Sequence, residues 1–231
     1  MAGIQLDAIP LNGRSLEEYR AIFGLDLRKL AGKRILDAAA GPASFSLEAA
    51  QAGAQAIALD PAYALGADRI LALSMAQIAD IRQKITPVTD RYRWSFYKDP
   101  EDLRRRREDV TRRFIDDISR IGGPARYLAA ALPRLPFADG AFHMTLCSHF
   151  LFLFSDRLDY QFHLAALLEL ARVTQEEALV YPVVGMDGKP YAHMNRLLTD
   201  LAAHNVKGYL APTEFEFLRG AKHLLRITKA A

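Results

Sequence analysis

The hydrophobic pattern near the start of the chain predicts a strand, a helix and a second strand. A short apolar run over 34–39 is broken by Gly41-Pro42, and residues 44–52 carry helix-forming side chains. A second apolar run over 56–59 ends on Asp60-Pro61. Two parallel strands joined by a helix need about this length, and the crossover is expected to be right-handed. A ligand of such a unit binds outside the carboxyl ends of the strands.

Helical patterns flank and follow this unit. Ser15-Leu16-Glu17-Glu18 forms a capping box that predicts a helix running toward Leu25. Residues 63–85 carry an apolar stripe with helical spacing, and a further helix is expected from Asp99, as N-cap, to near Gly122. Residues 62–124 are longer than a common connection between two strands, so we expect a helical insertion there.

Strand patterns return in the second half of the chain. One strand is expected to end on residues 147–150, and another on Tyr181-Pro182. Residues 214–228 form two alternating runs about Gly220, which is the signal of an antiparallel hairpin. With a length of 231 residues, the alternation of strands and helices predicts one α/β domain over 1–231.

Composition narrows the classes of protein that fit this fold. The net charge of +3 is small for the size of the chain and does not by itself indicate a nucleic acid or a membrane surface. No apolar run of eighteen residues exists, and the N-terminus lacks the order of a secretory signal, so we expect a cytoplasmic protein without a membrane partner. The one cysteine excludes an internal disulfide framework and a cysteine-rich zinc site. We expect no metal, because no metal-ligand grouping is formed by His163, His193, His204 and His223.

The run Arg104-Arg105-Arg106-Arg107 in the insertion raises the question of RNA binding. Residues 98–120 contain eight basic and seven acidic side chains, so the segment is nearly neutral. Acids stand four positions from arginines, a spacing typical of surface ion pairs, in Glu101/Arg105, Glu108/Arg112, Asp109/Arg113 and Asp116/Arg120. This pattern disfavours nucleic acid and favours a lid or the contact of a homodimer.

The turn after the first apolar run distinguishes two classes of cofactor. Dinucleotide sites use several glycines so that a pyrophosphate can approach a helix N-terminus, whereas this turn has one glycine and an acid, Asp37, in the preceding strand. That carboxylate would repel a pyrophosphate but tolerate a cationic cofactor. At Asp37, Gly41 and Asp60 the chain resembles the class I S-adenosylmethionine-dependent methyltransferases, whose first motif runs D-x-G-x-G-x-G. Ala39 and Ala43 stand where that family usually has glycine.

A second resemblance to these methyltransferases lies in residues 132–154. It is similar to the stretch that leads into the fourth strand of enzymes related to the quinone-ring methyltransferases, with His143 in place of an aspartate. The matching positions there and at the end of the next helix are Leu135, Pro136, Phe137, Asp139, Phe142, Glu169, Arg172 and Val173. The resemblance implies a Rossmann-like seven-stranded mixed sheet with an antiparallel last strand, and the helical insertion would lie between strands 2 and 3.

The resemblance also implies S-adenosyl-L-methionine as the cofactor. Asp60 would accept hydrogen bonds from both ribose hydroxyls. The adenine-binding aspartate of the family falls at Ala131, where one hydrogen bond is missing, although backbone donors around Leu132 could still bind the adenine. The expected cofactor-binding residues are Asp37, Ala39, Gly41, Pro42, Asp60, Pro61, Ala131, Leu132 and Ser148.

Candidates for catalysis and substrate binding come from other segments. His149 is the candidate general base, because histidine titrates near neutral pH, and a hydrogen-bonded structural histidine is the alternative. Residues 1–30 would cover the cofactor, with Tyr19 and Arg14 meeting the methionine carboxylate or the substrate, unless Tyr19 only packs its helix on the sheet. Aromatic residues of 91–97 would either form a wall of the acceptor pocket or pin the insertion to the body. The expected substrate contacts are Tyr19, Tyr92, Trp94, Tyr97 and Tyr191.

These residues favour methyl transfer to a small-molecule acceptor with an oxygen or nitrogen nucleophile. Most of the acceleration would then come from alignment of donor and acceptor. A catalytically inactive methyltransferase-like partner subunit is an alternative, because it would explain Ala39, Ala43 and Ala131 together. An RNA methyltransferase that uses the arginine-bearing helix is a third interpretation.

Overall fold

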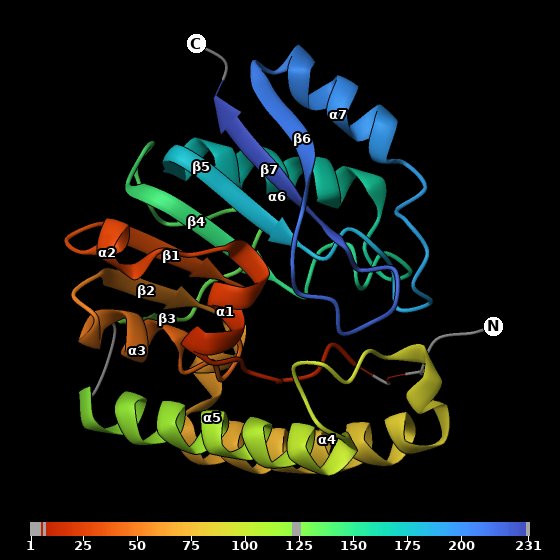
Figure 1. Cartoon of the computed structure of the whole chain (residues 1–231). Helices are drawn as coiled ribbons and strands as arrows, with labels where there is room; N and C mark the ends of the chain where they lie inside the picture. Colours follow the sequence, from red (N-terminus) through yellow and green to blue (C-terminus); the bar gives the residue numbers. More distant parts are fainter. Residues whose placement is uncertain (1–5, 7, 122–125, 230–231) are drawn as a thin grey trace.

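The computed structural model describes residue 6, residues 8–121 and residues 126–229. The described strands form one seven-stranded sheet, drawn in Figure 1. The strands are β1 Arg34–Ala38, β2 Gln55–Leu59, β3 Tyr127–Leu128, β4 Phe142–Ser148, β5 Thr174–Tyr181, β6 Val206–Pro212 and β7 His223–Lys229.

The order of the strands is β3-β2-β1-β4-β5-β7-β6. The pairs from β3 to β5 are parallel, while β7 runs antiparallel to both β5 and β6. This is the Rossmann-like mixed sheet with an antiparallel last strand that the resemblance implies, and the prediction is confirmed.

Helices cover both faces of the sheet and one of its edges. They are α1 Leu16–Phe23, α2 Leu27–Leu30, α3 Phe45–Gln51, α4 Ala67–Ile85, α5 Pro100–Ile121, α6 Tyr160–Val173 and α7 Met194–Ala203, with 3-10 turns η1 Pro61–Leu65 and η2 Thr86–Arg91. Residues of α6 and α7 pack with Leu36 on one face, whereas residues of α1 and α3 pack with Ile35 on the other. Successive side chains of β1 therefore serve opposite layers of the core.

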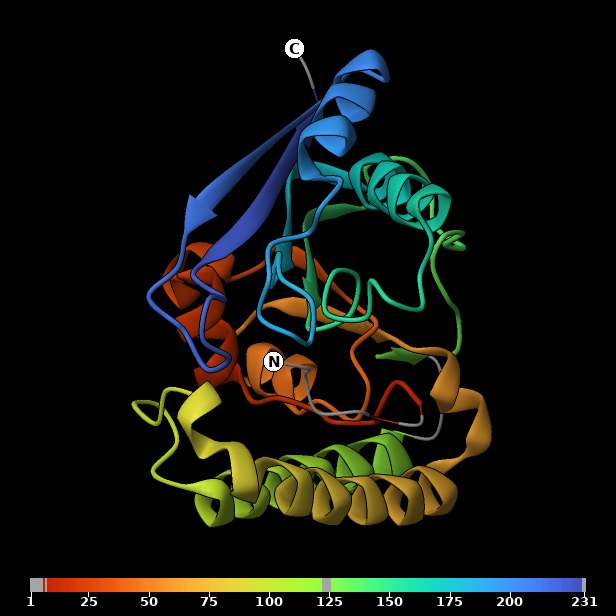
Figure 2. The same cartoon turned by 90° about the vertical axis from the view of Figure 1, so that its right-hand side faces the viewer.

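Helices α4 and α5 lie side by side along the β3 edge of the sheet (Figures 1 and 2). The predicted start of the second helix is confirmed: α5 begins at Pro100, and Asp99 accepts a hydrogen bond from the Asp102 N–H at 2.7 Å. Its expected end near Gly122 lies outside the described residues. The insertion therefore occupies the connection between β2 and β3.

The ion pairs of α5 differ from the predicted set. Asp109 and Arg113 form the expected pair at 2.7 Å. Arg104, in contrast, lies between Glu101 and Glu108 and pairs with both, because it stands three positions after one acid and four before the other.

The hairpin at the C-terminus also differs from the sequence prediction. The hairpin partner of β7 is β6, Val206–Pro212, and residues 214–219, which were expected to be this strand, lie in the connection between them. Phe215 and Phe217 instead pack against aromatic residues of the insertion, in contacts with Phe96 and Trp94 respectively. Burial of these rings outweighs the local alternation that suggested a strand.

The capping box at Ser15 is confirmed and begins α1. The Ser15 hydroxyl accepts from the Glu18 N–H, and the Glu18 carboxylate accepts from the Ser15 N–H, both at 3.3 Å. Gly13, just before the cap, lies against the turn after β1, where an added Cβ would stand 2.0 Å from the Pro42 carbonyl oxygen. The absence of a side chain at Gly13 is therefore what allows the N-terminal segment to approach this turn.

A buried ion pair joins α1 to α5. Arg107 donates from Nη1 to Glu18 Oε2 at 2.6 Å, although both residues are almost completely buried, with exposed fractions of 3% and 1%. The same guanidinium donates to the Tyr97 hydroxyl at 2.7 Å and to the Gly13 carbonyl oxygen at 3.1 Å. Burial opposes ionisation of Glu18, but Arg107 outweighs it and lowers the pKa of that carboxyl.

We predict that Arg107→Met strongly destabilises the protein, because it leaves the Glu18 carboxylate buried without its cation. Loss of one partner of such a pair costs about 3–5 kcal/mol in the free energy of unfolding, which urea denaturation measures. Arg104→Met is the matched control, since it removes a more exposed arginine of the same helix and should cost about 1 kcal/mol or less. Equal stability of the two variants would contradict the prediction.

Candidate functional site

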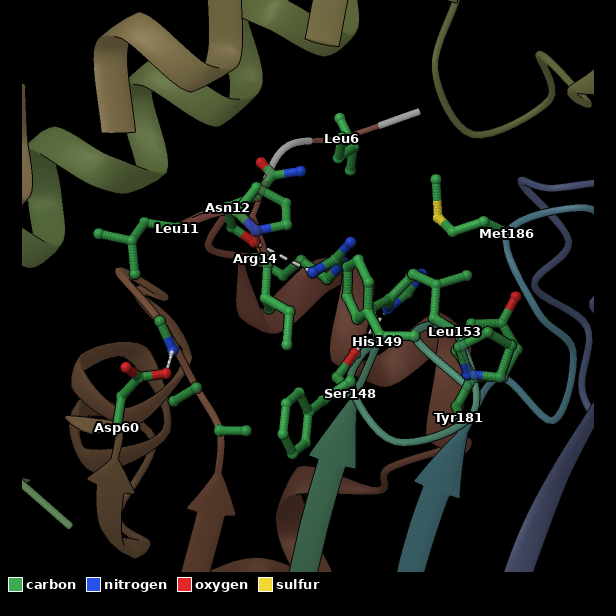
Figure 3. Close-up of a pocket in the computed structure, with 18 of the residues that line it drawn as sticks. Leu6, Leu11, Asn12, Arg14, Asp60, Ser148, His149, Leu153, Tyr181 and Met186 are labelled. Atoms are coloured by element: carbon green, nitrogen blue, oxygen red, sulfur yellow. Dashed lines mark hydrogen bonds between the residues drawn. The ribbon is translucent and has the colours of Figure 1, made fainter. Parts of the chain in front are cut away.

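A cavity of about 470 Å³ opens at the carboxyl ends of the central parallel strands. It is lined by residues that follow β1, β2 and β4 and by the last residue of β5 (Figure 3). Its volume lies in the range of about 300–1,000 Å³ that is usual for small-molecule sites. Its position is the one at which open α/β sheets bind their ligands.

Asp60 connects the end of β2 to the turn after β1. Its Oδ2 accepts from the Gly41 N–H and its Oδ1 from the Ala62 N–H, each at 2.9 Å. Burial raises the pKa of this carboxyl, and the two backbone donors counteract that effect. Each carboxylate oxygen has a second lone pair, so Asp60 can also accept hydrogen bonds from a ligand in the cavity.

Two residues of the cavity that are not glycine have left-handed backbone conformations. Ala39, in the turn after β1, has φ of 55°, and His149, directly after β4, has φ of 54°. This conformation costs a residue with a Cβ roughly 1–2 kcal/mol. Ala39 stands where the resembled family usually has glycine, so its methyl group accounts for a local strain at the ligand-facing turn.

Asp37 lies beneath the cavity and does not line it. Its Oδ1 accepts from the Tyr19 hydroxyl at 2.7 Å, and its Oδ2 is buried without a hydrogen-bond partner. Burial raises the pKa of this carboxyl to about 8, against an ordinary value of 3.8. Of the expected cofactor-binding residues, Asp37 and Pro42 are outside the lining, which contains Ala39, Gly41, Asp60, Pro61, Ala131, Leu132 and Ser148.

Ser148 and His149 lie at the centre of the cavity (Figure 3). The Ser148 Oγ and the His149 Nδ1 are 2.8 Å apart, and the His149 N–H donates to the Tyr181 carbonyl oxygen at 2.5 Å. Burial, and then the charges of Arg14 and Arg107, lower the pKa of His149 well below its ordinary value. The imidazole is therefore neutral at physiological pH.

Only one of the five expected substrate contacts lines the cavity: Tyr92. Tyr19 is bonded to Asp37, and Tyr97 to the Glu18–Arg107 pair. Trp94 donates to the Thr89 carbonyl oxygen, and Tyr191 packs on Phe152 and His163. These four side chains are taken up by interior contacts that a single sequence does not reveal.

The aromatic segment pins the insertion to the C-terminal part of the chain. Tyr92 forms a β-bridge with Leu218, and the Arg93 N–H donates to the Phe217 carbonyl oxygen at 2.8 Å. The Arg219 N–H donates back to the Arg91 carbonyl oxygen at 3.0 Å. The part of the insertion between α4 and α5 and the segment before β7 thus form one wall of the cavity.

Arg14 is a cation of the lining. Its Nη1 donates to the Asn12 carbonyl oxygen at 3.0 Å, and its Nε lies 3.8 Å from Glu18 and has no hydrogen-bond partner. The side chain is 13% exposed. Its Nε therefore faces Glu18, and the cavity is bordered by other atoms of the side chain.

Sequence reasoning missed most of the apolar lining. The cavity contains Phe150, Leu153, Phe154, Met186, Phe217 and Leu218, which come from three separate loops. The apolar run 150–154, directly after a strand, could have indicated part of this lining. Apolar side chains in a connection at the ligand-binding edge of a sheet are expected to pack against the protein core or against a ligand. The other residues are close only in the folded chain.

The described residues also bear on metal binding and on membrane insertion. Within the described ranges, no group of three or more histidine, cysteine, aspartate or glutamate side chains could hold a metal ion. None of the helices in the described part of the chain is long and apolar enough to cross a membrane.

No protein-family model matches the chain. An uncharacterized protein of Methanocaldococcus jannaschii is 27% identical over 230 residues, and the match covers 99% of this chain and 100% of that protein. The match extends over the whole length of both proteins, so it includes the insertion as well as the sheet.

Several solved structures are similar at low identity. The 1,6-didemethyltoxoflavin-N1-methyltransferase of Burkholderia thailandensis is 11% identical, with 89% of this chain and 76% of that chain covered and a TM-score of 0.45. The magnesium protoporphyrin IX methyltransferase of Synechocystis PCC 6803 is 13% identical, with coverage of 88% and 73% and a TM-score of 0.43. A SAM dependent methyltransferase of Aquifex aeolicus is 12% identical, with coverage of 91% and 90% and a TM-score of 0.43. Likeness at this distance identifies neither an activity nor a ligand.

The fold itself is established by the strand pairing of this chain. Seven described strands in the order β3-β2-β1-β4-β5-β7-β6, with β7 reversed, give the class I methyltransferase fold that the sequence motifs imply.

We predict that Asp37 makes the folded protein less stable as the pH rises from about 4 to about 8. In the folded state Asp37 keeps its proton up to the raised pKa of about 8, whereas in the unfolded state it loses the proton near the ordinary pKa of 3.8. Between these two pH values the unfolded state is therefore stabilised relative to the folded state, and the free energy of unfolding falls. One such group lowers the free energy of unfolding by up to about 1.4 kcal/mol for each unit of pH. Urea denaturation at several pH values measures it.

The matched comparison for this prediction is Asp37→Asn against Asp109→Asn, which changes a surface acid of α5. Asp37→Asn should remove the decline, and Asp109→Asn should follow the wild type. A pH profile of stability that is the same for Asp37→Asn and the wild type would show that Asp37 is ionised in the fold.

Proposed function

We propose that this protein catalyses S-adenosylmethionine-dependent methyl transfer to an oxygen or nitrogen atom of a small-molecule acceptor. The observation that supports the proposal is Asp60 at the end of β2, bonded to the turn after β1 and facing a cavity that also contains Ser148 and His149. S-Adenosyl-L-methionine, when bound, supplies a methyl group on a positively charged sulfur.

The nucleoside part of this cofactor fits the residues near Asp60. The carboxylate keeps free lone pairs after it accepts from Gly41 and Ala62, so it can accept from two vicinal ribose hydroxyls. Ala131 and Leu132 also line the cavity, and they follow β3, which pairs with the strand that carries Asp60 at its end. Ala131 has no side-chain acceptor for an adenine amino group, so the adenine would depend on backbone groups and apolar contact.

The amino-acid part of the cofactor fits Arg14. Arg14 lines the cavity, so its guanidinium could form a charge-assisted hydrogen bond with the methionine carboxylate. Tyr19, the other candidate for this carboxylate, donates its hydroxyl hydrogen to Asp37 instead. Arg14 is therefore the residue that we assign to the methionine carboxylate.

His149 is our candidate for the proton acceptor. If its Nδ1–H donates to the Ser148 Oγ, its Nε2 keeps a free lone pair. That nitrogen would take the proton of the acceptor hydroxyl or amine as the nucleophile bonds to the methyl carbon and the carbon–sulfur bond breaks, with its electron pair left on sulfur. The lowered pKa of His149 keeps the ring in the neutral form that this role needs, although it makes His149 a weak base.

A second candidate is a catalytically inactive methyltransferase-like partner subunit. The strained Ala39 and the missing acceptor at Ala131 favour it, because both weaken a cofactor site. Several arginines of α5 already have acidic partners and Arg107 is buried, so we do not assign RNA as the substrate. A homodimer through the insertion remains our expectation.

We predict micromolar binding of S-adenosylhomocysteine to the wild-type protein in calorimetric titration. Asp60→Ala should weaken it about tenfold to a hundredfold, because hydrogen bonds to a charged group are worth about 1.5–3 kcal/mol. NAD serves as the control ligand, and Asp139→Ala, which changes a surface acid bonded to Arg172, serves as the control variant. If the wild type binds no S-adenosyl compound, the proposed activity is wrong and the partner-subunit function gains support.

We also predict that Arg14→Met discriminates between two ligands of the same site. S-Adenosylhomocysteine has an amino-acid carboxylate and should bind about tenfold or more weakly to the variant, since a charge-assisted hydrogen bond is lost. 5′-Methylthioadenosine lacks that carboxylate and should bind both proteins equally. Equal weakening for both ligands would show that Arg14 supports the fold of the cavity rather than the carboxylate.

A further inference from the structure

The cavity has an apolar end on the far side of Ser148 and His149 from Asp60. Figure 3 shows Asp60 at one side of the pocket and Leu153, Tyr181 and Met186 at the other, with His149 between them. The strands β2 and β5, which carry Asp60 and Tyr181, are three strand spacings apart, about 14 Å. The two ends of the cavity can therefore bind different ligands, or different parts of one.

The apolar end is built from three segments of the chain. Leu153 and Phe154 come from the connection after β4, Met186 from the connection after β5, and Phe217 and Leu218 from the segment before β7. None of these side chains has a hydrogen-bonding group other than the weak thioether acceptor of methionine. The Met186 N–H donates to the Leu153 carbonyl oxygen at 3.1 Å, and Arg91, which donates to the Met186 carbonyl oxygen, accepts from the N–H of Arg219, the residue after Leu218.

No charged group of the described lining belongs to this end. Asp60 is at the opposite end, and Arg14 lies between Asn12 and His149 (Figure 3). The charge of Arg14 acts on both His149 and Tyr181, so Arg14 is the cation nearest to this end, and the proposed function assigns it to the methionine carboxylate. His149 is neutral, and burial raises the pKa of Tyr92 to about 12, so its hydroxyl stays protonated. Arg91 donates to the Met186 carbonyl oxygen at 3.4 Å but is not part of the lining.

Other polar groups at this end are engaged within the protein. The Tyr181 hydroxyl donates to the Ala221 carbonyl oxygen at 3.0 Å, and the Tyr181 carbonyl oxygen accepts from the His149 N–H. A ligand here would therefore meet apolar surface on most sides and find polar partners mainly at Ser148 and His149.

We propose that the methyl acceptor is an uncharged, largely apolar molecule with a ring of aromatic size, whose one nucleophilic hydroxyl or amino group lies toward His149. This inference rests on the proposed function, which places the cofactor at the Asp60 end and its carboxylate at Arg14. A carboxylate or phosphate on the acceptor would then be buried without a cation, and burying an unpaired charge is strongly unfavourable.

The shape of the apolar end supports a flat ring. The Phe217 ring is held edge-on by Trp94 and Tyr97, with ring centroids 5.3 and 4.9 Å away, and Leu218 is fixed by its bridge to Tyr92. These contacts fix the position of the Phe217 ring. Met186 also lines the cavity, and its unbranched side chain can adapt to differences in acceptor shape.

The test is a titration of the protein, saturated with S-adenosylhomocysteine, with 2-naphthol and with 2-naphthoate at about pH 7. The two probes share one ring system, but at this pH the phenolic hydroxyl is protonated and the carboxyl is ionised. We expect 2-naphthol to bind about tenfold or more tightly than 2-naphthoate, as measured by calorimetry. Tighter binding of 2-naphthoate, equal binding of the two, or binding of neither would overturn the inference.

A pair of variants locates the binding. Met186→Lys places a cation at the apolar end on an unbranched stem and should reverse the preference in favour of 2-naphthoate. Leu73→Lys, at a half-exposed position of α4, is the matched control and should leave the preference unchanged. An unchanged preference in Met186→Lys that still binds S-adenosylhomocysteine normally would also overturn the inference.

The proposed function and this inference fail in different ways. If S-adenosylhomocysteine binds but the probes do not show the expected preference, the acceptor class is wrong and the cofactor assignment stands. If S-adenosylhomocysteine does not bind to the wild type, the proposed function fails, and the inference fails with it. Should Met186→Lys not bind S-adenosylhomocysteine, the comparison of the two probes on the wild type still decides the question.

Discussion

The ion pair between Glu18 and Arg107 is the interaction on which the arrangement of the cavity depends. It joins α1, which carries Glu18, to α5 of the insertion, and it is buried between them. Through the bond from Arg107 to the Gly13 carbonyl oxygen it also holds the segment that brings Arg14 to the cavity. The desolvation of two charges opposes this contact, and the several hydrogen bonds to Tyr97 and Gly13 offset it. This contact therefore joins two parts of the sequence, residues 13–18 and residues 97–107.

The two ends of the cavity differ in the polarity of the side chains that line them. At one end Asp60 accepts hydrogen bonds from the chain and keeps capacity for more, and Arg14 offers a cation between this end and His149. At the other end the surface is apolar, and the neutral His149 separates the two. This division explains how a methyl donor with several polar groups and an acceptor with few could be held in line. Alignment of this kind accounts for most of the acceleration expected for a displacement at carbon.

Much of the fold could be predicted because its signals are local. The strand–helix–strand unit follows from apolar runs and one glycine, α1 from a capping box, and α5 from Asp99 and Pro100. The hairpin at the C-terminus was placed incorrectly, because Phe215 and Phe217 bury their rings against the insertion instead of forming a strand. Local alternation cannot anticipate a partner that lies more than a hundred residues away in the chain.

The sequence by itself determined the first strand–helix–strand unit, the position of Asp60 and of the turn at Gly41, and the pair Ser148-His149 at the end of a strand. These follow from periodicity and from adjacency along the chain, which folding preserves. Only the tertiary structure decided that Asp37 lies beneath the cavity with Tyr19, that Tyr97 and Arg107 belong to a buried network, and that loops after β4, β5 and β6 supply the apolar end. The physical reason is that burial and pairing depend on which segments meet across the sheet, and those contacts are made between residues far apart in sequence.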